Sequence, residues 1–289
     1  MIKKEKAGIN MLTVLNIEDK KPKNLVQAIK AIFRPYIINA EIRNAGGISV
    51  ADISYIRKRG DIRFNKIYEY CIGSSKTILC DKNISLKGTP FRRFEGFELN
   101  KKLLENFICD ILENSETDPA QLSISYYDPD ADSPAFAERL LKYSSKLTVV
   151  SNMPRFYENE SDRLLNEYGV SMIVSNSLDR LYPCDILIAP CKIKRPLPSV
   201  PSTPVFTVHR PLVAVPGNII TGYDIEIPEK YKPLKPDSTD KDYFLSGLYS
   251  LCAAHDIGAL IPHSCKSDCR TFTKSDIIRL IGASVSRKN

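Results

Sequence analysis

The chain has 289 residues, of which 43% are hydrophobic and 26% charged, and its formal net charge is +7. This composition is typical of a globular protein with a sizeable core, and no apolar run is long enough to cross a membrane. Eight cysteines at irregular spacings, several inside apolar runs, favour free thiols over a disulfide framework. Because no signal-peptide cleavage site follows the basic amino terminus, the sequence predicts a cytoplasmic protein without a membrane partner.

The first part of the chain, residues 1–118, mixes helix and strand signals. NLVQAIKAIFR (24–34) has apolar residues at helical spacing, and ELNKKLLENFICDILEN (98–114) carries a continuous apolar stripe, so both predict helices. KIYEYCIG (66–73) and KTILCD (76–81) predict two strands joined by a glycine–serine turn. We therefore expect a mixed α+β domain over this part.

Residues 119–210 alternate between strand and helix patterns. Such alternation is typical of a parallel sheet with crossover helices, and nearly uniform apolar runs fit strands buried on both faces. The sequence therefore predicts the α/β class, with a Rossmann-like three-layer domain here. The strand segments are AQLSISYYD (120–128), KLTVVSN (146–152), VSMIVSN (170–176), CDILIAP (184–190) and TPVFTV (203–208), and the helical segments are SPAFAERLLKYSS (133–145) and RFYENESDRLLNEYG (155–169).

The last part, residues 211–289, begins with a proline-rich stretch that predicts an extended connector. Two helical patterns follow, DKDYFLSGLYSLCAAHD (240–256) and KSDIIRLIGA (274–283), the second with Thr273 or Ser275 near its start. We expect these C-terminal helices to pack back on the N-terminal domain.

The turn after the first strand of the Rossmann-like domain has unusual chemistry. In YYDPDADSPAFAERLL it contains Asp128, Asp130 and Asp132 but no glycine. A dinucleotide-binding turn needs glycines so that backbone N–H groups can approach the pyrophosphate. Here Pro129 and Pro134 remove N–H donors, and the carboxylates repel phosphate. Conventional NAD(P) binding is therefore disfavoured, and the cofactor, if there is one, is unknown.

Three roles are open for these aspartates. The first, an EF-hand calcium loop, is excluded because the sequence does not match its pattern: Ser133 stands where that loop needs glycine, and Arg139 where it needs glutamate. A looser Mg²⁺ site, as in a metal-dependent transferase, would use Asp128 at the strand end. The third role is capping, in which Asp130 and Asp132 favour the positive N-terminus of the next helix.

Polar residues also follow the next two predicted strands. VVSN ends with Ser151 and Asn152, and IVSN ends with Ser175 and Asn176. Because ligands bind outside the carboxyl ends of parallel strands, these residues are predicted to line one rim together with Asp128. Turn and cap residues after strands would give the same pattern.

LTVVSNMPRFYENESDRLLNEYGVSMIV is similar to the second strand, helix and third strand of the cofactor-binding half of shikimate dehydrogenases and glutamyl-tRNA reductases. In those enzymes an Asn-Arg-Thr turn after the second strand binds the 2′-phosphate of NADP. In this chain Asn152 is followed by Met153 and Pro154, and the arginine is displaced to Arg155, which joins the predicted rim. The resemblance implies the architecture of an NAD(P)-dependent oxidoreductase.

Two further groups of residues are candidates for a catalytic role or a metal site. His209 follows a predicted strand and is, with Asp128, a candidate catalytic residue that would act as a general base. A cysteine- and histidine-rich stretch has pair spacings that a zinc site would need, although free buried thiols explain it as well. The residues of that stretch are Cys252, His255, His263, Cys265 and Cys269.

The leading functional prediction is a small-ligand-binding protein with a degenerate Rossmann-like domain that lacks the glycine-rich dinucleotide fingerprint. The alternatives are an NAD(P)-dependent oxidoreductase and a metal-dependent transferase that uses Asp128. A third alternative is a nucleic-acid or partner-binding module that uses the basic stretches 57–66 and 87–102. Nucleic acid is the less favoured partner because the basic runs match no recognised motif. Whether the protein is an enzyme, and its oligomeric state, are left open.

Overall fold

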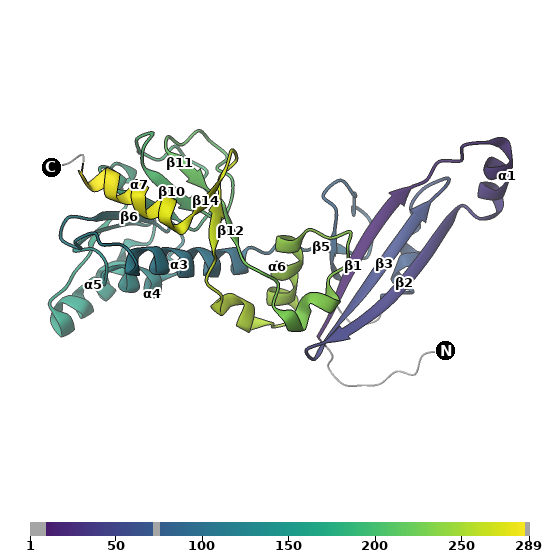
Figure 1. Ribbon diagram of the computed structural model, residues 1–289, viewed down its shortest axis with the longest axis horizontal. Coiled ribbons are helices and arrows are strands. Elements are labelled where there is room, and N and C mark those ends of the chain that lie inside the picture. Colours follow the sequence, from purple (N-terminus) through teal and green to yellow (C-terminus); the bar gives the residue numbers. More distant parts are fainter. Residues whose placement is uncertain (1–9, 72–75, 287–289) are drawn as a thin grey trace. The chain divides into compact units, whose positions relative to one another are not determined.

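The computed structural model describes residues 10–71 and 76–286 (Figure 1). The chain forms two compact units, and each unit is built from two separate stretches of sequence. Unit 1 comprises Met1–Leu99 and Glu226–Gly258, and unit 2 comprises Asn100–Ile225 and Ala259–Asn289. Unit 1 is mixed α+β and unit 2 is a Rossmann-like α/β unit with a parallel sheet, so the predicted fold class is confirmed.

Unit 1 contains a five-stranded mixed sheet in the order β2-β3-β1-β4-β5. Only β2 and β3 pair in antiparallel fashion, as a hairpin, and the other neighbouring strands are parallel. The sequence patterns had not indicated β1, β2 and β3, although these are the longest strands among the described residues. The strands are β1 (Asn10–Asp19), β2 (Tyr36–Ala45), β3 (Ile48–Arg57), β4 (Thr77–Cys80) and β5 (Arg92–Arg93).

Both faces of the unit 1 sheet are covered near its centre. On one face Leu15, Ile53 and Ile78 form a core with Ile67 of the short helix α2 (Phe64–Tyr68). On the other face, helix α6 (Lys241–Leu251) packs against β1 and β4. At Gly247 of α6, a Cβ atom would lie 2.8 Å from the Leu79 side chain. Only glycine therefore lets α6 approach the sheet this closely.

The strand predicted at 66–73 is wrong for the part that the structure describes. Residues 64–68 form α2 instead, and residues 72 and 73 lie outside the described residues. Ile67 is fully buried, whereas Tyr68 and Tyr70 are exposed, and the Cys71 thiol contacts the Ile67 carbonyl one helical turn back. One buried residue per helical turn fits the end of a helix, whereas in a strand the side chains alternate between two faces.

Unit 2 contains a six-stranded sheet in the order β11-β10-β9-β6-β7-β8, and every neighbouring pair is parallel. Numbered from β6, this is the 3-2-1-4-5-6 order of doubly wound nucleotide-binding folds. The predicted strands at the centre of this sheet are therefore confirmed. The strands are β6 (Ser123–Tyr127), β7 (Lys146–Val150), β8 (Ile173–Ser175), β9 (Ile186–Ala189), β10 (Pro204–Thr207) and β11 (Asn218–Ile220).

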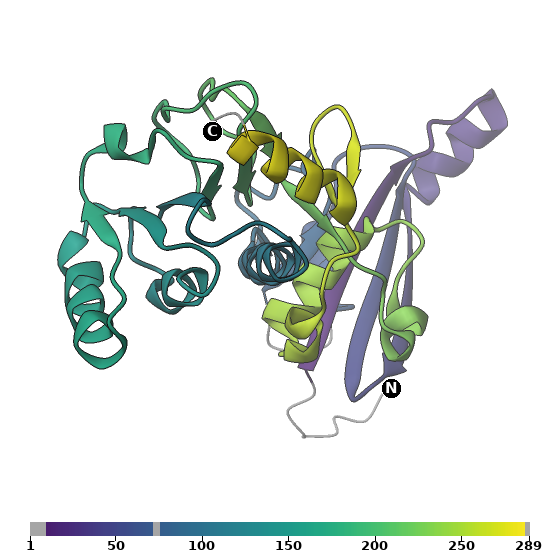
Figure 2. The same cartoon turned by 60° about the vertical axis from the view of Figure 1, so that its left-hand side comes forward.

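Three helices cover one face of this sheet, side by side (Figure 2). Phe206 of β10 meets Phe107 of the first helix with ring centroids 6.3 Å apart. Tyr126 of β6 packs edge-on against Phe136 of the second helix and Tyr157 of the third. The helices are α3 (Glu98–Glu113), α4 (Pro134–Leu140) and α5 (Pro154–Tyr168). The last ends at Gly169, which adopts the left-handed conformation that its sequence position predicted.

The opposite face of the sheet is covered mostly by irregular chain. Leu187 and Val205 on this face belong to a core cluster with Leu181 of the 3-10 helix η1 (Leu178–Leu181). The same cluster includes Ile193 and Leu197, from the long segment between β9 and β10. The three layers of unit 2 are therefore helices, sheet, and a layer of extended chain with a single helical turn.

The proline-rich stretch after residue 211 is more than a connector, because it supplies β11 and also β12 (Gly222–Asp224). Strand β12 pairs with the hairpin of β13 (Ser264–Lys266) and β14 (Thr271–Thr273) in a three-stranded antiparallel sheet of unit 2. Helix α7 (Lys274–Ser286) follows and packs on β10. Residues 100–118 and α7 belong to unit 2, and α6 belongs to unit 1, so these units divide the chain differently from the three zones expected from sequence.

Across the residues described, no helix combines the length and apolar character that a membrane span requires.

Candidate functional site

The site that the topology favours lies where the order of strands reverses. Strand β6 has β7 on one side and β9 on the other, and the chain reaches these neighbours by connections that run in opposite directions along the sheet. In doubly wound sheets, ligands bind outside the carboxyl ends of the strands at this point. Here those ends are Tyr127 of β6 and Ala189 of β9.

Asp128, the first residue after β6, turns its side chain under the helices. It is only 2% exposed, and its Oδ2 accepts hydrogen bonds from Tyr157 Oη at 2.6 Å and the Ser133 backbone N–H at 2.9 Å. Tyr126 Oη is a third and longer donor at 3.4 Å. Through these hydrogen bonds Asp128 links the end of β6 to the following turn and to α5. An oxygen surrounded by three donors is poorly suited to a cation, which needs that oxygen's lone pairs.

The turn between β6 and α4 does not fit a pyrophosphate. Ala131 adopts a left-handed backbone with φ of 53°, the kind of conformation that glycine usually supplies. The flanking Pro129 and Pro134 have no N–H to donate, and Ser133 N–H is already used by Asp128. The exposed Asp130 adds negative charge at the same place. The turn has thus kept a glycine-like backbone without the donors that make such turns bind phosphate.

The other predicted rim residues lie at the same edge of the sheet, but their side chains have different surroundings. The Ser151 backbone N–H donates to the Ser175 carbonyl and the Asn152 N–H to the Pro129 carbonyl, so the ends of β6, β7 and β8 are joined. Ser151 is buried and its hydroxyl accepts from the Met153 N–H. The side chains at this edge that are open to solvent are those of Asn152, Arg155 and Asn176.

The end of β6 and the segments that follow β6 and β9 carry ionisable side chains, and together with Lys101 of α3 we call them the switch-point cluster. Burial raises the pKa of Tyr127, Cys191 raises it further, and the opposite charges of Arg195 and Asp130 also act on it. Lys101 of α3 faces the same turn, with its Nζ 3.6 Å from Asp132. The cluster comprises Lys101, Tyr127, Asp130, Cys191 and Arg195.

Cys191 lies two residues after the end of β9. Burial raises the pKa of its thiol to about 12, and the carboxylates of Asp128 and Asp130 contribute to the rise. Its Sγ contacts the Tyr127 carbonyl at 3.8 Å. At neutral pH the group is a neutral thiol, so it is not an activated nucleophile.

His209 follows β10 and is half-buried. Burial lowers the pKa of its imidazole, and the positive charge of Lys192 lowers it further. The side chain is therefore neutral at pH 7, which is the protonation state of a general base. His209 therefore stays a candidate for that role.

The residues considered for zinc are split between the units. Cys252 and His255 belong to unit 1, whereas His263, Cys265 and Cys269 belong to unit 2. Within the described part of the chain, no group of three or more histidine, cysteine or acidic side chains is placed to hold a metal ion. Burial raises the pKa of the Cys252 thiol to about 11 and that of the Cys265 thiol to about 12, as expected of core thiols.

Many residues of the basic stretches already have acidic partners in the chain. Arg57 pairs with Asp19 at 2.6 Å, and Lys66 pairs with Glu69 at 2.7 Å. Lys102 contacts the buried Glu105 at 3.0 Å. These pairs reduce the positive charge that the stretches would present to a nucleic acid.

Sequence reasoning did not identify the switch-point cluster. Lys101 had been noted only as part of the basic stretch 87–102, and Cys191 only as one of eight irregularly spaced cysteines. The signal that was present is the position of Pro190 and Cys191 directly after an apolar strand. This position points to a site only once β9 is known to be the neighbour of β6, and the order of strands in the sequence does not show that.

No protein-family model matches the chain, and no curated protein matches it. Among solved structures it is similar to quinate dehydrogenase from Corynebacterium glutamicum in complex with NAD, with 8% identity, a TM-score of 0.29, and coverage of 69% of this chain and 80% of that one. It is also similar to L-tryptophan dehydrogenase from Nostoc punctiforme, with 10% identity, a TM-score of 0.29, and coverage of 97% and 89%. At this level neither structure assigns a ligand or an activity to the chain.

Proposed function

We propose that the protein binds a small zwitterionic molecule at the switch-point cluster, without conventional dinucleotide chemistry. The observation that carries the proposal is that two opposite charges, Asp130 and Arg195, stand on the two chain segments that leave the switch point, after β6 and after β9. Both side chains are exposed, and among the residues the structure describes neither has an ion-pair partner. A ligand with an ammonium and a carboxylate group would satisfy both.

The remaining members of the cluster fit the same ligand. Arg195 offers a planar fork for a carboxylate, and Asp130 accepts hydrogen bonds from an ammonium. Cys191, a neutral thiol in contact with the Tyr127 carbonyl, adds an uncharged side chain to the site. The site is thereby suited to binding rather than to covalent catalysis.

Thermal unfolding with the standard L-amino acids as probes tests this proposal. A ligand that binds only the folded protein raises the unfolding temperature in proportion to RT ln(1 + [L]/Kd). We expect at least one amino acid to do so at about 10 mM, and Asp130→Asn and Arg195→Gln each to remove the rise.

Asp179→Asn and Arg180→Gln are matched controls, because these exposed residues of η1 lie outside the cluster and should leave the rise intact. The proposal fails if no amino acid shifts the transition, or if the cluster variants respond as the unmodified protein does.

The competing function is an NADP-dependent oxidoreductase. It is favoured by the strand order of unit 2 and by exposed Asn152 and Arg155 after β7, where such folds bind the adenosine end of the cofactor. Calorimetric titration with NADP⁺ and NAD⁺ separates the two functions. Tight binding of NADP⁺ that Arg155→Gln weakens, with Asp130→Asn inert, would replace our proposal by this one.

A further inference from the structure

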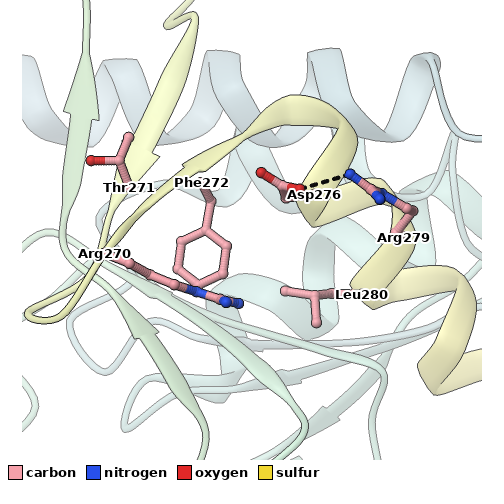
Figure 3. Close-up of a pocket in the computed structure, with 6 residues that line it drawn as sticks. All are labelled: Arg270, Thr271, Phe272, Asp276, Arg279 and Leu280. Carbon is pink, nitrogen blue, oxygen red and sulfur yellow. Dashed lines mark hydrogen bonds and ion pairs between the residues drawn. The ribbon is translucent and has the colours of Figure 1, made fainter.

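Unit 2 contains a cavity of about 290 Å³ that shares no residue with the switch-point cluster (Figure 3). It lies between β14 and the first turns of α7. Its lining combines two guanidinium groups with apolar side chains. The lining residues are Arg270, Thr271, Phe272, Asp276, Arg279 and Leu280.

Arg270 is held in place but keeps its hydrogen-bonding capacity. Its guanidinium carbon lies 4.0 Å from the centre of the buried Phe272 ring, which is a cation–π contact that orients the side chain along the cavity wall. Within the described residues its guanidinium has no hydrogen-bond acceptor or ion-pair partner. Its N–H donors are therefore available to a ligand.

Arg279 is positioned by its neighbours on α7. Its Nη2 donates to Asp276 Oδ1 at 2.8 Å and its Nε donates to the Ser275 carbonyl at 3.3 Å. The other oxygen of Asp276 accepts from the backbone N–H and hydroxyl of Thr273, which closes a capping box at the helix start. Asp276 is thus an internal counter-ion, and the cavity carries two positive charges and one negative charge.

We propose that this cavity binds a small organic monocarboxylate with a flat apolar body. The carboxylate would pair with the Arg270 and Arg279 guanidinium groups, and the body would pack on Leu280, beside the Arg270 guanidinium that covers the Phe272 ring. Arg–carboxylate pairs are geometrically matched and charge-assisted. The net charge of one positive unit favours a monoanion, because Asp276 would repel the second charge of a phosphate dianion.

Ligand-observed ¹⁹F NMR with 4-fluorobenzoate as the probe tests the proposal on the full chain. We expect the probe's signal to broaden on addition of protein, and benzoate to reverse the broadening. Benzamide, which has the same shape without the charge, should not compete.

Arg270→Gln and Arg279→Gln should each weaken the binding of 4-fluorobenzoate by about tenfold or more, since each removes a charge-assisted hydrogen bond. Arg180→Gln, an exposed arginine on η1, is the matched control and should bind as the unmodified protein does. Thermal unfolding checks that both pocket variants are folded. Asp130→Asn should also leave probe binding unchanged, so this test and that of the switch-point cluster can fail separately.

Three results would overturn the proposal. The first is no broadening of the probe's signal at millimolar concentration, and the second is equal competition by benzamide and benzoate. The third is a preference for phenyl phosphate over benzoate, which would contradict the assignment of a monoanion.

Discussion

At the scale of single residues, Asp128 shows how strand alternation decides what a side chain can do. Tyr126 and Asp128 are two positions apart, so their side chains point to the same face of the sheet. That face is covered by α4 and α5, where Tyr157 Oη lies 2.6 Å from Asp128 Oδ2. We therefore interpret Asp128 as a buried anchor of the turn, although the sequence also made it a candidate ligand and catalytic residue.

Loss of the Tyr157 hydroxyl should destabilise the protein. Tyr157→Phe removes one of the donors to a buried carboxylate, so we expect the free energy of unfolding to fall by about 1–3 kcal/mol. Tyr168→Phe is the matched control, because Tyr168 ends the same helix with an exposed side chain. Chemical denaturation of both variants measures the difference, and equal stability would contradict the anchoring role.

His209 should make the protein less stable in mild acid. Burial and Lys192 lower the pKa of the folded imidazole below its usual 6.5. The unfolded chain therefore binds a proton first as the pH falls through about 6.5, and this favours unfolding.

In His209→Asn, urea denaturation between about pH 7 and 5 should show a smaller loss of stability than in the unmodified protein. His255→Asn, at an exposed position, is the matched variant for comparison. An unchanged slope in His209→Asn would show that the imidazole is not desolvated in the fold.

At the scale of elements, the first helix shows that helical spacing does not by itself identify a buried face. Residues 24–34 were predicted to be helical, and α1 (Leu25–Phe33) forms there with Asn24 as its cap. Its apolar stripe is nevertheless exposed, with Leu25 at 77% and Phe33 at 81%. The helix lies in a connection between strands, and its buried contact is Ala31.

Substitutions on α1 should reflect this orientation. Leu25→Gln and Ile29→Gln should change the free energy of unfolding by less than about 0.5 kcal/mol, because both side chains are already in water. Ala31→Asp should cost about 2 kcal/mol or more, because it places a charge at a position that is 1% exposed. Thermal unfolding of the three variants provides the comparison, and a large loss from the glutamine substitutions would show that the stripe is covered.

At the scale of the whole molecule, each unit is completed by a segment distant in sequence. Residues 226–258 supply α6, which covers β1 and β4 of unit 1. Residues 259–289 supply α7 and the hairpin of β13 and β14, whose first strand pairs with β12 of unit 2. The N-terminal sheet therefore depends on a helix that lies about five-sixths of the way along the chain.

Overpacking α6 should destabilise unit 1 selectively. Gly247→Val puts carbon atoms where Leu79 and Leu12 already lie, so we expect a loss of about 1–3 kcal/mol. Gly282→Val is the control, because a Cβ at this position of α7 meets nothing within 4 Å.

Hydrogen exchange resolved by peptide checks this expectation. In Gly247→Val, exchange should accelerate in peptides from 10–71 and 226–258 and stay unchanged in 100–225. Faster exchange throughout the chain would show that the two units unfold as one.

The sequence by itself determined the strands at the centre of the parallel sheet, the helices α3, α5 and α7, and the chemistry of a turn without glycines. These features depend on local patterns, namely apolar runs, periodic stripes, caps and breakers. Tertiary structure alone decided which strands are neighbours and which helix faces are covered. It therefore also decided that Asp128 is buried beneath α4 and α5, whereas Cys191 lies beside the Tyr127 carbonyl at the switch point. Those relations join residues far apart in the chain, and no local pattern contains them.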